Sequence, residues 1–514
     1  MPQLCPVPVV PSYLVRPRRG LVALLVGVTL SLGLAHGVLA ATTWTVCASG
    51  CDYRSIKAAI AASTTLDGDA LAIAAGTYTE AGITVHKSLT LQGEAVATTI
   101  VQAAATPGTA TDRVFTIASG VEVTLQDLTI RHGRTTGDGG GIWNRGTLTL
   151  TNMIIRGNRA RSGGGIANQN SQYTSILTMI NTTLSGNTAD LDGGGLCSLG
   201  LLIVMNATIN GNTADFCGGG FSGWALRLTN VTLSGNAAGY CGGGIDPWSP
   251  MALTHTTISG NSAPFGGGLF VPSDVTLTHS IIADNDGGDC AVPTPISNGY
   301  NLDSDGSCHL AVPTDLPGVA PLLGPLQKNG GPTFTHALLP GSPAIDAIPW
   351  GVNGCGTTLY SDQRWQARPQ PAGGACDIGA YEVEVGGQPL GGWVTGLTPH
   401  PVTCQNVTTG QVVTLNAPTL PWDCEAAGLG VRSGDQVRLR VQGPVKTGVT
   451  DVGGVVTGMA PTSGGCTNLT TGQQAKFQAL FQGKLGATAA SCVAAGLVVQ
   501  PGDSVQMRVQ GVAE

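Results

Sequence analysis

The sequence predicts an all-β protein whose central part is a parallel β-helix solenoid, followed by two small tandem β modules. A block of about 24 residues recurs between residues 120 and 290, and each block carries a glycine triplet. Short strand-like runs separate the triplets, and a fixed period of this size is typical of a solenoid, whose units bury their apolar faces against their neighbours. Only 11% of the residues are charged and 42% are hydrophobic, a composition that favours an ordered, turn-rich chain over a disordered one.

Residues 1–40 have the features of a secretory signal peptide. Three arginines precede an apolar run from Leu21 to Ala35, and small residues follow up to Ala40. This order predicts export with cleavage near Ala40. The alternative is an uncleaved membrane anchor, but the run is short for a membrane span, and no later run reaches about 18 apolar residues. We therefore expect no transmembrane span after signal removal.

Residues 41–119 are expected to hold the N-terminal cap and the first coils of the β-helix. The stretch from Tyr53 to Ser63 has apolar residues at helical spacing, which predicts a short helix covering the open strand edges of the first coil. A glycine-bounded segment at 76–80 indicates a turn. The first strands are expected at 71–74, 83–85 and 89–91.

Residues 120–290 are the regular repeats, each with three short strands and three corners. Glycine at one corner permits a positive φ without a Cβ penalty. Another corner carries a row of polar side chains that begins at Gln126, and we expect its members to hydrogen-bond along the axis. This ladder consists of Asn152, Asn181, Asn206, Asn230, His255 and His279. A further asparagine precedes most triplets by five or six residues, at 158, 187, 212, 236 and 261.

A leucine-rich repeat is the alternative solenoid, because the stretch from Leu228 to Asn236 fits that signature if valine is allowed. Such a repeat usually continues with a helix after the asparagine. Here a glycine triplet and another strand follow, and glycine is about 1 kcal/mol less favourable than alanine in a helix. The β-helix is therefore the better interpretation.

Beyond the repeats the periodicity fades. Residues 291–386 are rich in proline, glycine and cysteine and are expected to close the far end of the solenoid. Residues 391–443 and 453–511 are then a tandem duplication, since the string around Cys404 recurs around Cys466 and the string around Cys424 recurs around Cys492. Each copy is too small for a large core, so we expect each to depend on its own disulfide.

Cysteine usage supports export. Of the 14 cysteines, Cys5 would leave with the signal peptide, and Cys197 is expected to be unpaired and outward-facing. Cys217 and Cys241 precede the triplets of consecutive repeats, and stacked coils about 4.8 Å apart suit a disulfide. The expected pairs are Cys47–Cys51, Cys217–Cys241, Cys290–Cys308, Cys355–Cys376, Cys404–Cys424 and Cys466–Cys492.

Aromatic residues on two consecutive repeats form the candidate ligand-binding site. Phe216 aligns with Tyr240, and Trp224 aligns with Trp248, on either side of the expected Cys217–Cys241 bridge. Stacked rings on a rigid scaffold suit the apolar face of a sugar. The alternative is that these rings only cover a corner. Nucleic acid is not an expected partner, because the net charge of −7 is opposite to that of a phosphate-binding surface.

No catalytic residues and no cofactor are predicted, with calcium as the single alternative. Asn301, Asp303 and Asp305 imitate the start of a calcium loop, but Val312 stands where a glutamate is expected, so a turn pinned by Cys290–Cys308 is the main interpretation. Acidic residues are not stacked on adjacent coils as a lyase or a glycoside hydrolase would need. His255 and His279 continue the corner ladder, which favours a structural role.

Several strings resemble known families. The segments 51–60 and 76–80 resemble the start of pectin-lyase-like right-handed β-helices, and the repeats resemble those of bacterial polymorphic outer-membrane proteins. The segments 301–308, 339–346, 362–364 and 376–382 are similar to the choice-of-anchor Q domain. Together these resemblances cover roughly residues 44–384 and imply an exported, surface-associated bacterial right-handed β-helix. Trp365 stands where that family commonly has glycine.

Three functions follow as hypotheses. The first is a secreted or cell-surface, non-catalytic, adhesin-like rod that binds a polysaccharide or a cell-surface glycan. The second is a polysaccharide lyase or glycoside hydrolase of the pectin-lyase-like class, and the third is a structural wall or sheath component. Fold alone does not decide among them, and the sequence leaves the oligomeric state open.

Overall fold

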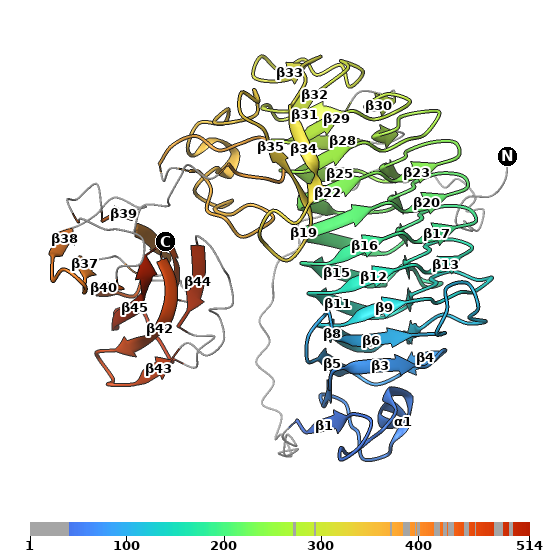
Figure 1. Ribbon diagram of the computed structural model, residues 1–514, viewed down its shortest axis with the longest axis horizontal. Coiled ribbons are helices and arrows are strands. Elements are labelled where there is room, and N and C mark those ends of the chain that lie inside the picture. The colour runs from blue at the N-terminus through green and yellow to red at the C-terminus, as the bar shows by residue number, and fades with distance from the viewer. Residues whose placement is uncertain are drawn as a thin grey trace, which may run out of the picture.

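The computed structural model describes residues 41–270, 274–291, 295–370 and 373–383 and most of the strands between 391 and 513. Its main body is a parallel β-solenoid that runs from β1 (Thr43–Val46) to β33 (Leu316–Pro317) (Figure 1). The predicted signal peptide at 1–40 lies outside the described residues. No described helix is long and apolar enough to cross a membrane.

Three long stacks of parallel strands form the walls of the solenoid. The first contains β1, β2 (Ala70–Ile73), β5 (Leu89–Gly93), β8 (Glu122–Gln126), β11 (Thr147–Thr151), β15 (Ile176–Ile180), the start of β19 (Leu201–Asn210) and of β22 (Arg227–Ser234), β25 (Met251–Thr254), β28 (Val275–Thr278) and β31 (Ile296–Ser297). The second contains β3 (Gly76–Thr79), β6 (Thr99–Gln102), β9 (Thr129–Arg131), β12 (Ile154–Arg156), β16 (Thr183–Ser185), the ends of β19 and β22, β26 (Thr257–Ser259), β29 (Ile281–Ala283), β32 (Leu302–Asp303) and β33.

The third stack follows the glycine triplets. It contains β4 (Ile83–Val85), β7 (Phe115–Ile117), β10 (Ile142–Asn144), β14 (Ile166–Asn168), β18 (Leu196–Ser198), β21 (Phe221–Gly223), β24 (Ile245–Pro247), β27 (Leu269–Phe270) and β30 (Cys290–Ala291). A short fourth stack contains β13 (Arg159–Ala160), β17 (Thr188–Ala189), β20 (Thr213–Ala214) and β23 (Ala237–Ala238). Repeats stay in register, so that Ile142 pairs with Ile166 and Ile166 with Leu196. The prediction of a parallel β-solenoid is confirmed.

Alternating side chains fill the interior. In β11, Leu148 and Leu150 are fully buried, while the threonines between and beside them are only partly buried. Because successive strand residues point to opposite faces, every coil delivers its aliphatic side chains inward, and these form one continuous apolar core along the solenoid.

The glycine triplets solve two separate steric problems. The first glycine of a triplet has a positive φ, as at Gly163 with φ 64°. The second and third glycines are required because backbone of the next coil approaches them too closely for a side chain. A Cβ on Gly164 would lie 2.3 Å from the carbonyl oxygen of Thr188, and a Cβ on Gly165 would lie 2.6 Å from that of Gly195. The expected positive φ therefore explains only the first member of each triplet.

A buried ladder of asparagines runs beside the triplets. In each link, Oδ1 of one asparagine accepts hydrogen bonds of 2.8–3.1 Å from both the backbone N–H and the Nδ2 of the asparagine one coil earlier. The Nδ2 atoms also donate to backbone carbonyls. The ladder satisfies buried backbone groups that the bend leaves unpaired. Its members are Asn158, Asn187, Asn212, Asn236, Asn261 and Asn285, and it ends at Asp289.

The N-terminal coils contain a helix and one strand where a turn is expected. Helix α1 (Ile56–Ala61) begins after Ser55, whose Oγ accepts from the backbone N–H of Ala58, and it lies at the β1 end of the solenoid (Figure 1). The prediction of a turn at 76–80 is wrong, because residues Gly76–Thr79 form β3 with Tyr78 directed inward. Its phenol donates to the carbonyl oxygens of Val46 and Ala74.

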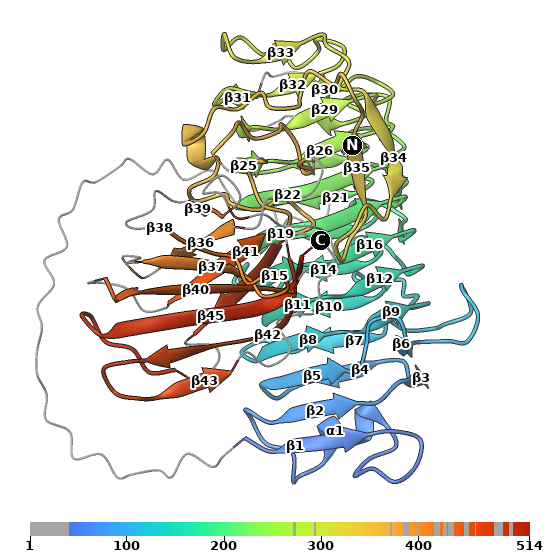
Figure 2. The same cartoon turned by 60° about the vertical axis from the view of Figure 1, so that its left-hand side comes forward.

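After β33 the chain folds back along the side of the solenoid instead of only closing its end. Strands β34 (Leu323–Gln327) and β35 (Thr335–Leu338) pair in antiparallel fashion, and the 3₁₀ helix η1 (Val352–Gly354) follows. Strands β34 and β35 lie beside the solenoid (Figure 2), where Phe334 and His336 bond Thr208 and Ser234. The 3₁₀ helix lies at a later coil, where Asn353 donates to the carbonyl oxygen of Asn298. The Gln363 side chain bonds the hydroxyls of Thr208 and Thr232, and the backbone N–H of Ala380 donates to Thr257. The segment 323–383 therefore covers the second stack.

The duplicated C-terminal region differs from the expected pair of separate modules. One sheet contains β36 (Gly391–Thr395), β39 (Trp422–Asp423), β41 (Gly453–Thr457) and β44 (Ala487–Ser491). The other contains β37 (Val402–Asn406), β38 (Val412–Leu415), β40 (Gln436–Pro444), β42 (Met459–Asn468), β43 (Gln474–Lys476) and β45 (Ser504–Ala513). Each sheet mixes strands of both copies, and the two copies share one hydrophobic cluster. Sharing gives each short copy a core that it could not build alone.

Six disulfides form with the expected pairings. Cys217 and Cys241 bridge neighbouring coils with a Cα–Cα distance of 4.7 Å. The prediction of an unpaired, exposed Cys197 is wrong. Its side chain is fully buried beside Leu199, Tyr173 and Trp248, and it is not a free thiol. It faces away from the main core, as expected, but neighbouring side chains cover that face.

Candidate functional site

Three aromatic rings line one corner of consecutive coils. Phe216 and Tyr240 stack with 5.2 Å between ring centroids and 3° between ring planes, and Tyr240 then contacts Phe265 edge to face at 5.1 Å. Inter-coil backbone hydrogen bonds from Tyr240 to Phe216 and from Phe265 to Tyr240 fix the row, and the Cys217–Cys241 disulfide lies directly beside it. We call these three residues the aromatic row. The sequence spacing predicted Phe216 and Tyr240 as a pair, and Phe265 was not among the predicted site residues.

The ring faces in this row are not equally available. Phe216 and Tyr240 turn one face toward each other, so those faces are used within the protein. Phe265 is rotated by 62° relative to Tyr240 and is 50% exposed. This rotation arises because Phe265 stands one position later in the repeat and bridges to Cys241 in the strand register. Phe265 is therefore the member with the most accessible apolar surface.

A second apolar patch surrounds Trp224, which follows β21. Trp224 is 38% exposed, and its ring contacts that of Tyr173 at 5.4 Å. The large aliphatic side chains of Leu201 and Leu226 are exposed on neighbouring segments. The backbone N–H of Trp224 donates to the carbonyl oxygen of Ser198, which fixes the segment to the preceding coil. We call Trp224, Tyr173, Leu201 and Leu226 the Trp224 patch.

Trp248 does not pair with Trp224, so the expected stack of these two rings is wrong. Its indole N–H donates to Oδ2 of Asp246 at 2.7 Å, and its ring packs against Cys197 and Leu199. Asp246 also accepts from Ser222 at 3.0 Å, and burial raises the pKa of its carboxyl group. The two tryptophans do occupy equivalent positions in consecutive coils, as predicted. The direction of each side chain, however, depends on contacts that the repeat period does not reveal.

The corner ladder is a row of residues in the left-handed backbone conformation. Asn152, Asn181, Asn206, Asn230, His255 and His279 all have φ between 47° and 53°. Asparagine tolerates this region better than most residues, which explains its recurrence. Hydrogen bonds join Asn181 to Asn152, Asn230 to Asn206, and His279 to His255 at 3.1–3.2 Å. The row begins at Asp127, not at Gln126, because Gln126 still pairs within β8.

The two histidines are unsuited to acid–base work at neutral pH. Both are fully buried, and their rings contact each other at 4.7 Å. Burial and then the Arg368 charge lower the pKa of His279 to about 4, and the same causes hold the pKa of His255 well below its usual range. Both rings are therefore neutral at pH 7, in agreement with a structural role.

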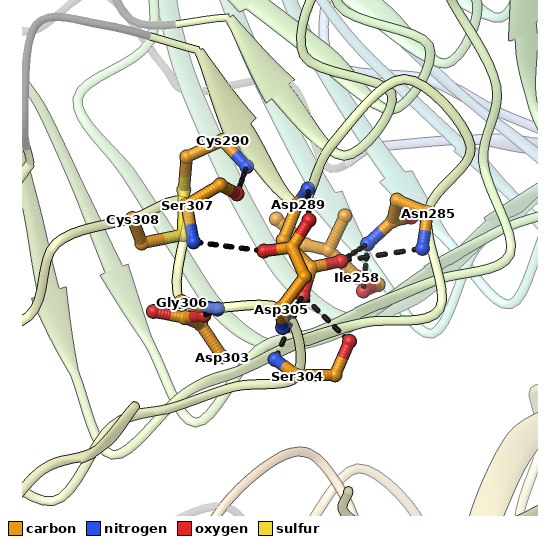
Figure 3. Close-up of a disulfide and its surroundings, with 10 residues drawn as sticks. All are labelled: Ile258, Asn285, Asp289, Cys290, Asp303, Ser304, Asp305, Gly306, Ser307 and Cys308. Carbon is orange, nitrogen blue, oxygen red and sulfur yellow. Dashed lines mark hydrogen bonds between the residues drawn. A yellow bond between two sulfur atoms is a disulfide. The ribbon is translucent and has the colours of Figure 1, made fainter. Parts of the chain in front are cut away.

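The expected calcium loop is rearranged (Figure 3). Asn301 is not part of it, because its Oδ1 accepts from the backbone N–H of Ser280 inside the coil. Asp289 takes its place beside Asp303 and Asp305, and these three residues offer carboxylate oxygens within 4.8 Å of one another. Burial, together with the charges of Asp289 and Asp305, raises the pKa of Asp303 to about 6. Nothing in the local sequence identifies Asp289, since the solenoid turn supplies it.

Another concentration of charge lies inside the segment that covers the second stack. Arg364 bonds Asp362 at 2.8 Å, and Arg368 bonds Glu382 at 3.0 Å, with all four side chains at most 1% exposed. Arg364 also lies 3.7 Å above the Tyr381 ring. These buried pairs also bond backbone groups of the same segment and so hold its turns together. Because they are buried, these four side chains are not accessible to a substrate.

No family model and no curated protein matches the chain. Among solved structures, it is similar to a pectin methylesterase variant in complex with a hexasaccharide, with 11% identity and a TM-score of 0.22, over 51% of this chain and 78% of that one. It is also similar to the enzymatically active domain of tailspike protein 4 of bacteriophage CBA120, with 11% identity and a TM-score of 0.16, over 87% of this chain and 62% of that one.

Proposed function

We propose that the protein is an exported, non-catalytic rod that binds glycans through the Phe265 end of the aromatic row and through the Trp224 patch. The observation that carries this proposal is the exposure of large aromatic surface on rigidly paired coils, at Tyr240, Phe265 and Trp224. Rings held by a scaffold lose little freedom on binding, and the apolar face of a sugar ring packs against an aromatic face. Six disulfides support an oxidising, extracellular setting.

Cell-surface attachment is part of the same proposal. The resemblance to the choice-of-anchor Q domain supports a surface-associated, right-handed β-helix, in which α1 covers the first coil. The duplicated C-terminal region is assigned to attachment. Deleting residues 387–514 should release the protein from the cell surface into the medium. Retention of the truncated, folded protein on cells would contradict this role.

A polysaccharide-cleaving enzyme is the second candidate, and Asp246 is the residue that favours it. Its buried carboxyl group lies beside Trp248 and has a raised pKa, as a general acid would require. Glycoside hydrolysis needs a second carboxyl group within about 5–10 Å. Asp192, which accepts from the backbone N–H of Cys217 near Asp246, is the candidate, but both carboxyl groups are buried. The burial of both carboxyl groups keeps a polysaccharide away from them, which favours binding over cleavage.

Glycan binding by the full exported protein tests the proposal. Arrays identify a ligand, and calorimetry then compares the wild type with Phe265→Ala and Trp224→Ala. Each loss of an aromatic contact should weaken binding about three- to tenfold. Trp350→Ala is the matched control, since Trp350 is a comparably exposed aromatic residue outside both patches, and it should bind as the wild type does. Unchanged binding by both patch variants would remove the proposal.

Product release from pectate, alginate and common glycans distinguishes binding from cleavage. We expect no turnover by the wild-type protein. Turnover that disappears in Asp246→Asn, while glycan affinity is kept, would establish the enzyme instead. Turnover that persists in that variant would place the chemistry elsewhere, and it would also overturn the non-catalytic proposal.

A further inference from the structure

The strongest additional feature is the acidic cluster of Asp289, Asp303 and Asp305 at the end of the buried asparagine ladder. The Cys290–Cys308 disulfide, with a Cα–Cα distance of 4.8 Å, ties the two segments that carry these residues (Figure 3). None of the described ion pairs involves these carboxylates. Three acidic groups are thus held close together without a basic side chain to balance them.

The second observation concerns Asp303 alone. Its side chain is fully buried, and its Oδ2 atom makes no hydrogen bond of normal geometry with the described residues, although the backbone N–H of Gly318 lies close enough to favour the charged form of the carboxyl group. Its other oxygen accepts from the backbone N–H of Gly306. A buried carboxylate oxygen without a donor is costly unless a cation or another donor reaches it. This unpartnered atom distinguishes the cluster from an ordinary acidic turn.

The other two carboxylates differ in what they can offer. Both oxygens of Asp289 already accept hydrogen bonds, from Asn285 on one side and from Ser304 and the backbone N–H of Asp305 on the other. Asp305 is exposed, and each of its oxygens accepts one backbone hydrogen bond, from Ser307 and from Asp289. Asp305 can therefore bind an ion arriving from solvent, while Asp289 mainly supplies negative charge and orients Asp305.

We propose that Asp303 and Asp305 bind one Ca²⁺ ion, with the Asp289 carboxylate beside it and water completing the coordination. Oxygens that share one Ca²⁺ at about 2.4 Å lie at most about 4.8 Å apart, whereas around Mg²⁺, at about 2.1 Å, they lie at most about 4.2 Å apart. The oxygens of the cluster lie within 4.8 Å of one another. The spacing admits either ion, but Ca²⁺ accepts irregular sets of oxygen ligands, whereas Mg²⁺ demands near-ideal octahedral geometry and gives up its water reluctantly. The pinned, irregular loop therefore favours Ca²⁺.

Calorimetry and thermal unfolding of the full chain test this proposal, after removal of divalent ions with a chelator. Titration with CaCl₂ should show one site, with a Kd of about 0.1–1 mM as in extracellular modules, and CaCl₂ should raise the unfolding midpoint. MgCl₂ should bind at least tenfold more weakly. Asp303→Asn and Asp305→Asn should each weaken calcium binding at least tenfold. Asp215→Asn is the control, because Asp215 is exposed on a distant coil, and it should leave binding unchanged.

Two features keep the test decisive. Asp303→Asn removes a buried negative charge, so its calcium-free unfolding midpoint should equal or exceed that of the wild type, which separates lost binding from lost folding. If that variant does not fold, Asp305→Asn at the exposed position decides the question. Absence of calcium binding by the wild type, or wild-type affinity in Asp305→Asn, would overturn the proposal. Neither outcome depends on whether the aromatic residues bind glycans.

Discussion

Oδ1 of Asn212 accepts two hydrogen bonds from Asn187, one from the backbone N–H at 3.0 Å and one from Nδ2 at 2.9 Å. Asn212 in turn donates from Nδ2 to the carbonyl oxygen of Leu184 and to the next asparagine. A single buried amide therefore serves both the coil before it and the coil after it. The ladder couples coils through side chains, in addition to the parallel strand pairing.

Replacing Asn212 by alanine should be strongly destabilising. The substitution leaves two donors of Asn187 and one carbonyl oxygen without partners in a buried site, and each such group costs about 1–3 kcal/mol. We expect the free energy of unfolding to fall by roughly 3–5 kcal/mol, measured by urea denaturation. Asn298→Ala, at an exposed asparagine whose Nδ2 bonds one threonine hydroxyl, should cost below about 1 kcal/mol. Equal losses in the two variants would contradict the role of the ladder.

The buried histidine pair should make stability depend on pH. The folded-state pKa of His279 is about 4, below the unfolded value of about 6.5, so the unfolded state binds more protons between these values. Stability is therefore fully present above about pH 6.5 and falls as the pH drops toward 4, by about 3 kcal/mol for this group. Denaturation between pH 4 and 7 measures the slope.

The double variant His255→Asn/His279→Asn isolates this effect, since asparagine occupies the same corner in four earlier coils with the same positive φ. The variant should lose most of the slope. Asp377, whose pKa burial raises to about 6, contributes the opposite slope in both proteins and does not affect the comparison. An unchanged slope would show that other groups control the pH dependence.

At position 365, glycine should give a more stable protein than alanine, which is the reverse of the usual order. The φ of Trp365 is 72°, a left-handed conformation that costs a residue with a Cβ about 1–2 kcal/mol. Trp365→Gly should therefore be about 1 kcal/mol more stable than Trp365→Ala in urea denaturation. At Trp350, which has no positive φ, alanine should be at least as stable as glycine. Greater stability of Trp365→Ala would contradict the strained backbone.

The Cys217–Cys241 bridge should contribute more stability than the Cys47–Cys51 bridge. It closes a loop of 24 residues, against 4 for the other pair, and the entropy of the unfolded chain falls more for the longer loop. Replacing both cysteines of the 217–241 pair with serine should lower the free energy of unfolding by about 3 kcal/mol. Serine at 47 and 51 should cost less. The opposite order would show that strand pairing already provides the constraint.

Periodic features could be predicted from the sequence, and features that depend on long-range packing could not. The triplets and the cysteines before them repeat at the coil period, so the solenoid and the bridge between Cys217 and Cys241 followed from spacing alone. The asparagines before the triplets were equally visible at that period. Their ladder was missed because the sequence does not show whether an asparagine in a turn is buried. Burial is what makes their mutual hydrogen bonds obligatory.

The failures share one physical cause. Gln363 bonds Thr208 and Thr232 across more than a hundred residues, and no repeat marks such a contact. Cys197 and Trp248 both face away from the main core, as strand alternation requires, but the structure buries that outer surface. Asp289 joined the acidic cluster only because the coil returns it beside Asp303. Each of these errors concerns which surface is covered, a property of the complete fold.

The buried row of amides has a direction, because in every link the asparagine of the earlier coil donates its hydrogen bonds to the asparagine of the later coil. It starts where Asn158 accepts from the N–H of Gly133 and ends at Asp289, whose carboxylate accepts from Asn285 but has no side-chain N–H to donate, so that only its backbone N–H bonds onward, to Asp305. An internal unit is interchangeable with its neighbours, whereas the two ends are not. The rod could therefore be lengthened or shortened by whole turns in its middle, and a turn added beyond Asp289 would require a new terminal acceptor.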